Sequence, residues 1–549
     1  MLGKMMSSAL TVPSLLDHAN RYHGATEIVS VATSGKVERV TWHDIWVNAR
    51  QLSSALRALG LPKGARVCTV AWNNRYHLEI YFGVAGAGMV CHTINPRLFL
   101  EQLIFIINHA EDAVLFVDET FLPLVAKIRE SIPTVQHFIL MSENQPEDTF
   151  GLNILLYNEL LQRATAAKSA ASTNQWADID ENQPSSLCYT SGTTGNPKGV
   201  LYTHRSTVLH SLGGNQPDGL GIKARDCVLP VVPMFHVNAW GVPYVAAATG
   251  CKLVLPGPGL DGNSLVQLID TEQVTLALGV PTIWQGLLTA LEQTGSKATS
   301  LERTIVGGSA LPASMIQTFR DHYNVELIHA WGMTETSPLG TLNQLLEKHS
   351  ALDADAQTKL RLGQGRPPYG VELQVVDEAG QVLANDGETP GLLQIRGHWI
   401  VDTYFQSDSS ALSEAGWFDT GDIATLDADG YLVIRDRAKD VIKSGGEWIS
   451  TVELENIMVA HPKVQTAAVI AARHDKWDER PVVIVVAAEG VELSEAEVLG
   501  FYDGKIAKWQ IPDRVIFVDA LPIGGTGKIL KNQLRDSYAN VLVDTPEPA

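Results

Sequence analysis

A stretch rich in glycine and hydroxyl side chains, YTSGTTGNPKGV, spans residues 189–200. Its hydroxyls and successive backbone amides can point at one anion, and Gly192 and Gly195 permit the necessary turns. Lys198 adds a mobile positive charge. The spacing is not that of a P-loop, because Pro197 stands where the second glycine would be. We therefore predict a phosphate-binding loop of another kind, with an ordinary Ser/Thr turn as the alternative.

Two other glycine clusters also depart from known nucleotide-binding patterns. GVAGAGMVC, at 83–91, lacks the third glycine of a dinucleotide fingerprint and lies in an apolar helical stretch, which favours close helix packing. PIGGTGKIL, at 522–530, has Pro522 for the first P-loop glycine and Ile529 for the Ser/Thr. Taken alone, Lys528 in that turn is typical of a solvated loop.

Seven motifs in a fixed order carry the argument further. They are YTSGTTGNPKGV, PMFHVNAWG (233–241), GGSALP (307–312), HAWGMTETSP (329–338), WFDTGD (417–422), DRAKDVIKSGGEWIS (436–450) and GGTGK (524–528). Together they resemble the adenylate-forming superfamily of acyl-CoA synthetases, luciferases and peptide-synthetase adenylation domains. The resemblance covers nearly the whole chain and is strongest to bacterial medium-chain fatty-acid–CoA ligases and the similar 3-methylmercaptopropionate–CoA ligases.

The resemblance implies a two-step reaction. A carboxylate attacks ATP to give an acyl-adenylate and pyrophosphate, and the thiol of coenzyme A then displaces AMP to give a thioester. A carboxylate is a poor electrophile, so one of its oxygens must first receive a good leaving group. Attack at the α-phosphate builds negative charge, which Mg²⁺, cations and aligned amides stabilise.

The resemblance also assigns roles around the phosphates. The β- and γ-phosphates would be surrounded by Thr190, Ser191, Gly192, Thr193, Thr194, Gly195 and Lys198. Thr334 would hydrogen-bond the α-phosphate, and Glu335, with Thr190, would hold Mg²⁺. Lys528 would reach the bridging and α-phosphate oxygens during adenylation.

The nucleoside has its own set of residues under the same resemblance. Trp331 would stack on adenine, with Gly308 and Ser309 lining the base pocket. Asp422 would accept from both ribose hydroxyls, because a carboxylate offers two acceptor oxygens. Arg437 would lie beside the ribose and phosphate.

A moving small domain is implied as well. We expect a large AMP-binding domain over 1–437 and a small domain over 438–549, with a hinge near Lys439. Rotation between half-reactions would withdraw Lys528 and open a path for the thiol. The coenzyme A tunnel would be lined by Gly445, Gly446, Glu447 and Trp448.

The acyl chain is assigned to the motif around His236. This histidine is either a pocket wall that shifts as the carboxylate enters or a satisfied core side chain, and Trp240 is either an indole gate or plain wall packing. The other candidates are Val237, Gly308, Pro338 and Leu339. They include no cation to pair with a second substrate acid, which favours an uncharged, apolar acyl tail.

Five other functional classes share part of this pattern. A peptide-synthetase adenylation module would need an acid for an α-amine and usually a carrier domain. A luciferase-like oxygenase, or an enzyme with another acyl acceptor, would share the adenylation motifs. A non-enzymatic sensor should have lost Lys528, Glu335 and Asp422, and a simple ATPase would release ADP.

The elements that position these residues alternate between strand and helix. ARVCTVAW, DAVLFVD, VTLALGV and RTIVGGSA each precede an amphipathic stretch. This rhythm predicts an α/β fold of helix-covered, mainly parallel sheets. Loops are predicted over 163–186 and 348–370. Strand pairs after Gly370 indicate a small distorted barrel, and the last ~110 residues indicate an α+β domain.

Composition limits the number of domains, the classes of partner and the cellular location. The 549 residues suffice for two or three domains, and a net charge of -20 argues against nucleic-acid binding. Five widely spaced cysteines without a C-x-x-C favour a reducing cytoplasm. We expect no signal peptide and no membrane span. A homodimer remains open by analogy with related synthetases.

Overall fold

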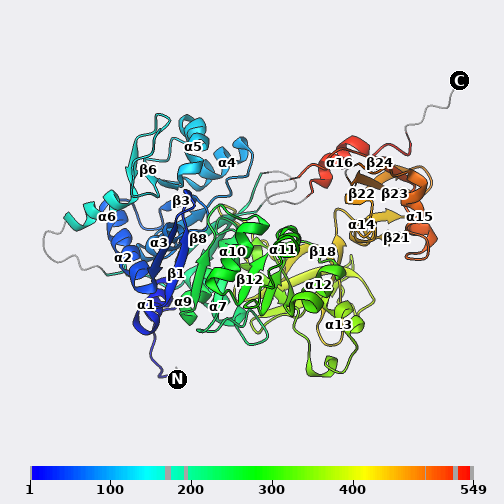
Figure 1. The fold of residues 1–549 in the computed structure, drawn as a ribbon, viewed down its shortest axis with the longest axis horizontal. Helices are drawn as coiled ribbons and strands as arrows, with labels where there is room; N and C mark the ends of the chain where they lie inside the picture. The colour runs from blue at the N-terminus through cyan, green and yellow to red at the C-terminus, as the bar shows by residue number, and fades with distance from the viewer. Residues whose placement is uncertain (1–2, 167–174, 191–195, 489, 524–528, 544–549) are drawn as a thin grey trace. The chain divides into compact units, whose positions relative to one another are not determined.

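The computed structural model of the chain describes residues 3–166, 175–190, 196–488, 490–523 and 529–543. The chain divides into two compact units, residues 1–372 with 396–418 and residues 373–395 with 419–549 (Figure 1). The domain boundary expected between 437 and 438 falls within the second unit and stays a prediction.

Two mainly parallel sheets build the first unit, and both confirm the strand–helix rhythm of the sequence. The eight-stranded sheet is antiparallel only at its edge pairs β15–β14 and β1–β2. Its strands in spatial order are β15 (Leu339–Leu342), β14 (Glu326–Gly332), β13 (Arg303–Val306), β12 (Leu276–Gly279), β10 (Cys227–Pro230), β11 (Lys252–Leu255), β1 (Glu27–Val31) and β2 (Val37–Thr41).

The seven-stranded sheet is parallel except for its last pair, β8–β9. Its strands in spatial order are β7 (Ile154–Leu156), β6 (His137–Leu140), β5 (Val114–Val117), β3 (Arg66–Val70), β4 (Val90–Thr93), β8 (Pro184–Tyr189) and β9 (Gly199–Thr203). The antiparallel return of β9 brings both ends of the predicted phosphate loop to one edge.

Helices cover both faces of these sheets, as buried parallel strands require. Successive residues of β13 point to opposite faces of the sheet and pack in different hydrophobic cores. Ile305 packs in the core formed with α1, α2, α3 and α9, and Val306 packs in the core formed with α10, α11 and α12. The α-helices are α1 (Val12–His23), α2 (Trp42–Ala58), α3 (Arg75–Gly86), α4 (Leu100–Ala110), α5 (Leu122–Ile128), α6 (Tyr157–Ala166), α7 (His204–Gly214), α8 (Val237–Trp240), α9 (Val242–Thr249), α10 (Gly262–Glu272), α11 (Pro281–Thr294), α12 (Ala313–Tyr323) and α13 (Ala354–Arg361). The 3₁₀ turns are η1 (Glu119–Phe121), η2 (Arg129–Ser131), η3 (Thr334–Thr336) and η4 (Glu347–His349).

Close packing of α3 explains the apolar glycine cluster. A Cβ on Gly83 would lie 2.8 Å from Leu52 Cδ2 and 3.0 Å from the Ala49 carbonyl oxygen of α2. The prediction that this cluster serves helix packing is thus confirmed for Gly83.

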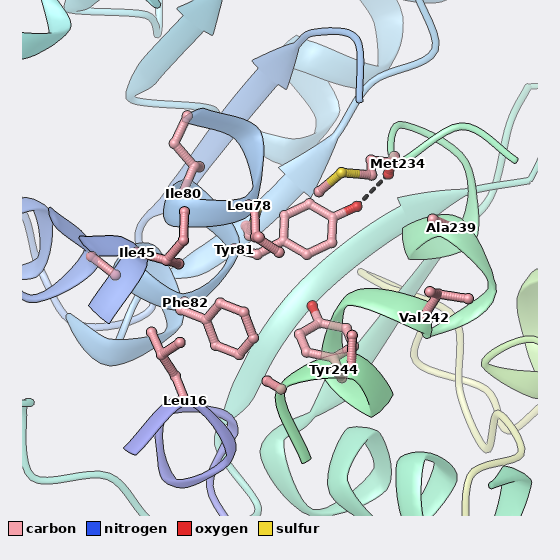
Figure 2. Close-up of a cluster of buried hydrophobic side chains, with 14 of the residues drawn as sticks. Leu16, Ile45, Leu78, Ile80, Tyr81, Phe82, Met234, Ala239, Val242 and Tyr244 are labelled. Atoms are coloured by element: carbon pink, nitrogen blue, oxygen red, sulfur yellow. Dashed lines mark hydrogen bonds between the residues drawn. The ribbon is translucent and has the colours of Figure 1, made fainter. Parts of the chain in front are cut away.

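The same helix fixes the backbone that precedes His236. The Tyr81 hydroxyl donates to the Met234 carbonyl (Figure 2). The Met234 N–H donates over 2.7 Å to Oδ1 of Asn73, which lies two residues before α3. Phe82, the next residue of α3, is buried in the same core. The core of the first unit therefore anchors one of the predicted site motifs.

A four-stranded sheet opens the second unit. Its strands follow the order β16 (Val371–Val376), β17 (Gly391–Gly397), β18 (Phe418–Leu426) and β19 (Leu432–Arg437). The sequence indicated a small barrel here; the described strands form an open series, with β16 and β19 at its two ends. Four strands are too few to close around a core of side chains.

The rest of the second unit is a five-stranded α+β sandwich, as predicted. Neighbouring residues of β22 face opposite sides, Val469 toward the core with α14 and α15 and Ile470 toward the core with α16. The strands are β21 (Glu447–Ile449), β20 (Ile442–Ser444), β23 (Asp478–Ala487) and β22 (Val464–His474), with β24 (Arg514–Phe517) parallel to β23. The helices are α14 (Thr451–Val459), α15 (Glu495–Gly500), the 3₁₀ turn η5 (Lys508–Gln510) and α16 (Lys531–Tyr538). Among the helices that the structure describes in either unit, none is both long and apolar enough to cross a membrane.

The two predicted loops are partly wrong. Residues 163–166 belong to α6, and β8 already begins at Pro184. Residues 354–361 form α13, whose N-cap Asp353 accepts from the Ala356 N–H over 2.8 Å. A polar stretch has no apolar stripe to reveal a helix, so this helix start is signalled by its cap alone.

Candidate active site

The phosphate-loop motif is closed at its base by β8 and β9. Tyr189 and Gly199 face each other across this antiparallel pair. Beyond them, the Thr190 N–H donates to the Lys198 carbonyl over 2.8 Å, and the Lys198 N–H donates to Thr190 Oγ1 over 3.2 Å. The predicted phosphate ligands Ser191, Gly192, Thr193, Thr194 and Gly195 lie outside the described residues.

A second predicted motif meets this hairpin through its backbone. Thr334 and Glu335 form the 3₁₀ turn η3 and are both buried. The Tyr202 hydroxyl of β9 donates to the Thr334 carbonyl over 2.7 Å. Two segments that are far apart in the sequence, and that the resemblance assigns to the same phosphates, are therefore linked directly.

Tyr404 contacts both segments, and no local sequence pattern marks it. Its hydroxyl lies 2.8 Å from Glu335 Oε1, and Lys198 Nζ lies over its ring, 4.7 Å from the centroid. Burial, reinforced by the Glu335 carboxylate, raises the pKa of Tyr404 well above its usual range. The hydroxyl is therefore protonated and donates to the carboxylate.

The predicted adenine residues gather at the carboxyl ends of two neighbouring parallel strands. Trp331 is the penultimate residue of β14, and Gly308 and Ser309 follow the end of β13 by two and three residues. Gly308 has a positive φ of 86°, which favours glycine. A Cβ on Gly340 would lie 2.4 Å from Trp331 Cζ3, so glycine at this position makes room for the indole. Ligands in open α/β sheets bind at such strand ends.

The acyl-pocket motif contains an unusual left-handed turn. Residues 237–240 all have positive φ, between 44° and 57°, and Gly241 continues the turn at 78°. Such a conformation costs roughly 1–2 kcal/mol per non-glycine residue, so surrounding contacts must hold it. The Asn238 side chain donates to Ser186 Oγ over 3.0 Å and supplies one such contact.

This turn carries Trp240 to β13. A Cβ on Gly307 would lie 3.2 Å from the Trp240 ring and 2.9 Å from the Ala330 carbonyl oxygen. Trp240 thus lies next to the GGSALP motif, which also contains the predicted pocket residue Gly308. His236, directly before the turn, is partly buried, and Val237 is buried.

His210 joins another pair of acyl-pocket candidates and was not foreseen from the sequence. Its Nε2 accepts from the Leu339 N–H over 3.3 Å, and burial lowers its pKa to about 4. A Cβ on Gly241 would lie 2.7 Å from its ring. Pro338, beside Leu339, is buried as well. A neutral imidazole therefore packs between the left-handed turn and the start of β15.

The second unit brings two predicted ribose-binding residues together. Asp422 and Arg437 face each other across β18 and β19, and Arg437 Nε lies 2.9 Å from Asp422 Oδ1. The Asp422 side chain is buried, whereas the Arg437 side chain is 40% exposed. The pair orients a carboxylate at one edge of this sheet.

The predicted coenzyme A residues form a hairpin in the same unit. Gly445 and Gly446 are the two turn residues between β20 and β21, and their φ values of 60° and 89° require glycine. Glu447 and Trp448 begin the return strand β21. The turn itself thus explains the glycines, and a role in binding coenzyme A stays a prediction. The predicted hinge Lys439 follows β19, and Lys528 lies outside the described residues.

Known protein families match most of the chain. The family of AMP-binding enzymes matches residues 15–405, and its C-terminal domain matches residues 453–528. The chain belongs to the AMP-binding enzymes. The sequence-based expectation of this family is thereby confirmed.

Several members of this family resemble the chain over nearly its full length. It is 60% identical over 545 residues to the 3-methylmercaptopropionyl-CoA ligase of Ruegeria lacuscaerulensis, covering 99% of this chain and 100% of that protein. It is 57% identical over 544 residues to the medium-chain-fatty-acid–CoA ligase of Ectopseudomonas oleovorans, covering 99% and 98%. The crystal structure of an anthranilate CoA ligase in complex with anthranoyl-AMP has a TM-score of 0.83 at 25% identity, covering 97% of this chain and 98% of that one.

The predicted Mg²⁺ can be tested against the residues of this AMP-binding enzyme. Mg²⁺ usually takes one or two carboxylates and fills its other positions with substrate phosphates and water. Glu335 offers such a carboxylate and is only 6% exposed. Its partner Tyr404 also contacts Lys198, at the base of the phosphate loop. The residues present therefore fit a magnesium ion that arrives with a phosphate.

Proposed function

We propose that the chain is an AMP-forming acyl-CoA synthetase that activates a short- or medium-chain carboxylic acid. The observation that carries this proposal is the junction of the phosphate-loop hairpin with η3. Tyr202 joins β9 to the Thr334 carbonyl, and Tyr404 contacts both Glu335 and Lys198. These contacts bring an ammonium, a buried carboxylate and a threonine close together, which supports a role for them in triphosphate chemistry.

In the first half-reaction, a carboxylate oxygen attacks the α-phosphorus of ATP. The bond from that phosphorus to the bridging oxygen breaks, and pyrophosphate leaves with the electron pair. Lys198 would stabilise the charge that develops on the departing phosphates, and Thr334 would hydrogen-bond the α-phosphate. Glu335 would hold Mg²⁺, which when bound neutralises phosphate charge. Lys528 and residues 191–195 complete the proposed set.

Two groups of residues are proposed for the nucleoside, one for the base and one for the ribose. Trp331 would stack on adenine beside Gly308 and Ser309. Asp422 would accept from the ribose hydroxyls, with Arg437 holding its carboxylate in place. Because Asp422 is buried and paired with Arg437, its acceptor oxygens are held in a fixed direction.

In the second half-reaction, the coenzyme A thiolate attacks the acyl carbonyl carbon. The mixed anhydride breaks, and AMP leaves as the anion. We propose that the chain turns about Lys439 between the two steps and that the hairpin of Gly445, Gly446, Glu447 and Trp448 lines the path of the pantetheine. Glycine backbones would leave room for a slender chain.

The acyl tail is proposed to be apolar. The candidate wall residues His236, Val237, Trp240, Pro338 and Leu339 include neither a lysine nor an arginine. Medium-chain fatty acids and 3-(methylthio)propanoate are the candidate substrates, in keeping with the names of two relatives that are 60% and 57% identical to this chain. A cytoplasmic location and a homodimer are proposed with them, and size-exclusion chromatography with light scattering tests the dimer.

Release of AMP from ATP and Mg²⁺ tests this function. The panel of acids runs from acetate to palmitate and includes 3-(methylthio)propanoate, each with and without coenzyme A. A synthetase forms AMP in a coenzyme-A-dependent manner with an optimum within the panel. AMP release that does not depend on coenzyme A would indicate another acyl acceptor. Oxygen uptake would indicate a luciferase-like enzyme, and formation of ADP would indicate a simple ATPase.

A further inference from the structure

A short segment after β17 is attached to both halves of the phosphate site. Within residues 401–405, the Val401 N–H donates to the Glu335 carbonyl over 2.8 Å. Four residues later, the Phe405 N–H donates to the Gly199 carbonyl over 2.8 Å. The first bond reaches η3 and the second reaches β9, so this segment holds the two at a fixed separation.

Tyr404 projects from that segment to the charged groups themselves. Its hydroxyl donates to Glu335 Oε1 over 2.8 Å, and Lys198 Nζ lies 4.7 Å from its ring centroid. One ring therefore holds an ammonium at its face and a carboxylate at its hydroxyl end. The backbone bonds of the segment position the ring, and the ring positions both charges.

We propose that Tyr404 is a positioning residue that orients Glu335 for Mg²⁺ and Lys198 for the phosphates of ATP. The inference rests on the proposed function and adds a residue that no motif marked. By donating to one carboxylate oxygen, the hydroxyl fixes the plane of the Glu335 carboxylate and so the direction of its other oxygen. Partners of this kind behind a metal ligand typically change metal affinity or activity by about 10–100-fold.

The aromatic face of Tyr404 acts on Lys198, separately from the action of the hydroxyl on Glu335. An exposed lysine loses side-chain entropy when it is fixed on a ligand. A weak cation–π contact keeps the Lys198 ammonium near the loop without neutralising its charge, whereas an ion pair would neutralise it. Removal of the hydroxyl alone should therefore weaken metal binding, and removal of the whole ring should also weaken binding of the nucleotide.

The test measures Mn²⁺ binding to the full-length protein by electron paramagnetic resonance in the presence of α,β-methylene-ATP, which cannot be adenylated. Tyr404→Phe should bind Mn²⁺ about 10-fold more weakly than the wild type. Tyr404→Leu should in addition bind the nucleotide analogue more weakly. The matched control is Tyr369→Phe, because Tyr369 is 79% exposed and its ring lies next to that of His398, and it should bind Mn²⁺ as the wild type does.

A double-mutant cycle separates positioning from general structural damage. If Tyr404 acts through Glu335, then Tyr404→Phe should have little further effect on Mn²⁺ affinity in a Glu335→Gln background. Unchanged Mn²⁺ affinity in Tyr404→Phe, or equal losses in both backgrounds, would overturn the inference. If Tyr404→Phe folds poorly by circular dichroism, Tyr404→His, which keeps a ring and an N–H donor, is expected to retain more Mn²⁺ affinity than Tyr404→Leu. Equal affinities of those two variants would overturn it as well.

Activity assays on the same wild-type and variant proteins test the proposed function separately. Wild-type protein that makes acyl-CoA while Tyr404→Phe binds Mn²⁺ normally would refute only the role of Tyr404. Wild-type protein that makes no acyl-CoA with any acid would refute the proposed function. The Mn²⁺ measurement needs no acyl substrate and still decides the role of Tyr404 in that case.

Discussion

Arg437 Nε lies 2.9 Å from Asp422 Oδ1, and this ion pair ties the two central candidates for ribose binding to facing positions of β18 and β19. The Asp422 carboxylate is buried, while the Arg437 guanidinium reaches solvent. An anion held in this way is a directed acceptor. A substitution at Asp422 can therefore test whether this residue binds the ribose.

Asp422→Asn should weaken ATP binding with little loss of folding. The amide keeps one acceptor oxygen but loses the charge, and hydrogen bonds to charged groups are worth about 1.5–3 kcal/mol, or roughly 10–100-fold in KM for ATP. Asp427→Asn in the same hairpin is the control, since its Oδ1 accepts the backbone N–H groups of Asp429 and Tyr431 in a turn and an amide oxygen can replace it. Steady-state kinetics that show equal KM values for the two variants would argue against ribose binding by Asp422.

Lys439→Pro should separate the two half-reactions. Proline fixes φ and so restricts rotation at this position. Adenylation, measured by trapping the acyl-adenylate with hydroxylamine, should persist, while acyl-CoA formation should fall at least 10-fold. Lys439→Ala, which leaves the backbone free to turn, should retain both steps. Equal losses in the two half-reactions of Lys439→Pro would show that Lys439 is no hinge.

Acid should destabilise the first unit through buried neutral histidines. Burial lowers the pKa of His210 to about 4, against about 6.5 in an unfolded chain. Between these pH values the unfolded chain binds a proton that the folded chain excludes. The unfolding free energy is thus fully retained above pH 6.5 and falls as the pH drops toward 4, by roughly 3 kcal/mol for this residue. His77 and His204 behave alike, with pKa values lowered to about 4 by burial.

Urea unfolding between pH 7.5 and 4.5 measures this effect. His210→Gln can still accept from the Leu339 N–H but does not titrate, so its unfolding free energy should depend less steeply on pH than that of the wild type. The dependence should not vanish, because the other two histidines remain. Parallel pH profiles for the wild type and His210→Gln would contradict the assignment of a buried, neutral His210.

Trp240 should control acyl chain length. Its indole lies against Gly307, so Trp240→Ala should open space there and move the optimum of the acid panel toward longer chains, with KM for ATP unchanged. Gly307→Ala adds a methyl 3.2 Å from the indole and 2.9 Å from the Ala330 carbonyl oxygen, so both must shift, and it should disfavour the longest acids that the wild type accepts. An unaltered chain-length profile in both variants would assign Trp240 to wall packing away from the substrate.

Much of the fold follows from local sequence signals. The apolar run of β12 and Pro281 at the start of α11 predict a strand followed by a helix, and both form. By contrast, α13 begins in a polar segment whose sole signal is the Asp353 cap. Where hydrophobic periodicity is absent, the sequence alone gives little basis for telling a capped helix from a loop.

The candidate site residues also fall into those with a sequence signal and those without one. Thr334 and Glu335 lie in a recognisable motif, and Gly307 begins one. Tyr404 lies in a polar stretch, VDTYFQSD, and only the tertiary structure shows that its hydroxyl contacts Glu335. The left-handed run over 237–240 was equally hidden, because its residues are not glycines and the conformation is imposed by contacts such as Asn238 with Ser186.

The central claim is that a carboxylate oxygen of the substrate attacks the α-phosphorus of ATP. Mass spectrometry of AMP formed from an ¹⁸O₂-labelled acid, in the presence of Mg²⁺ and coenzyme A, tests it most directly. An acyl-adenylate route transfers one ¹⁸O from the acid to AMP in each turnover and leaves pyrophosphate unlabelled. Unlabelled AMP, or label in inorganic phosphate together with ADP, would contradict that route.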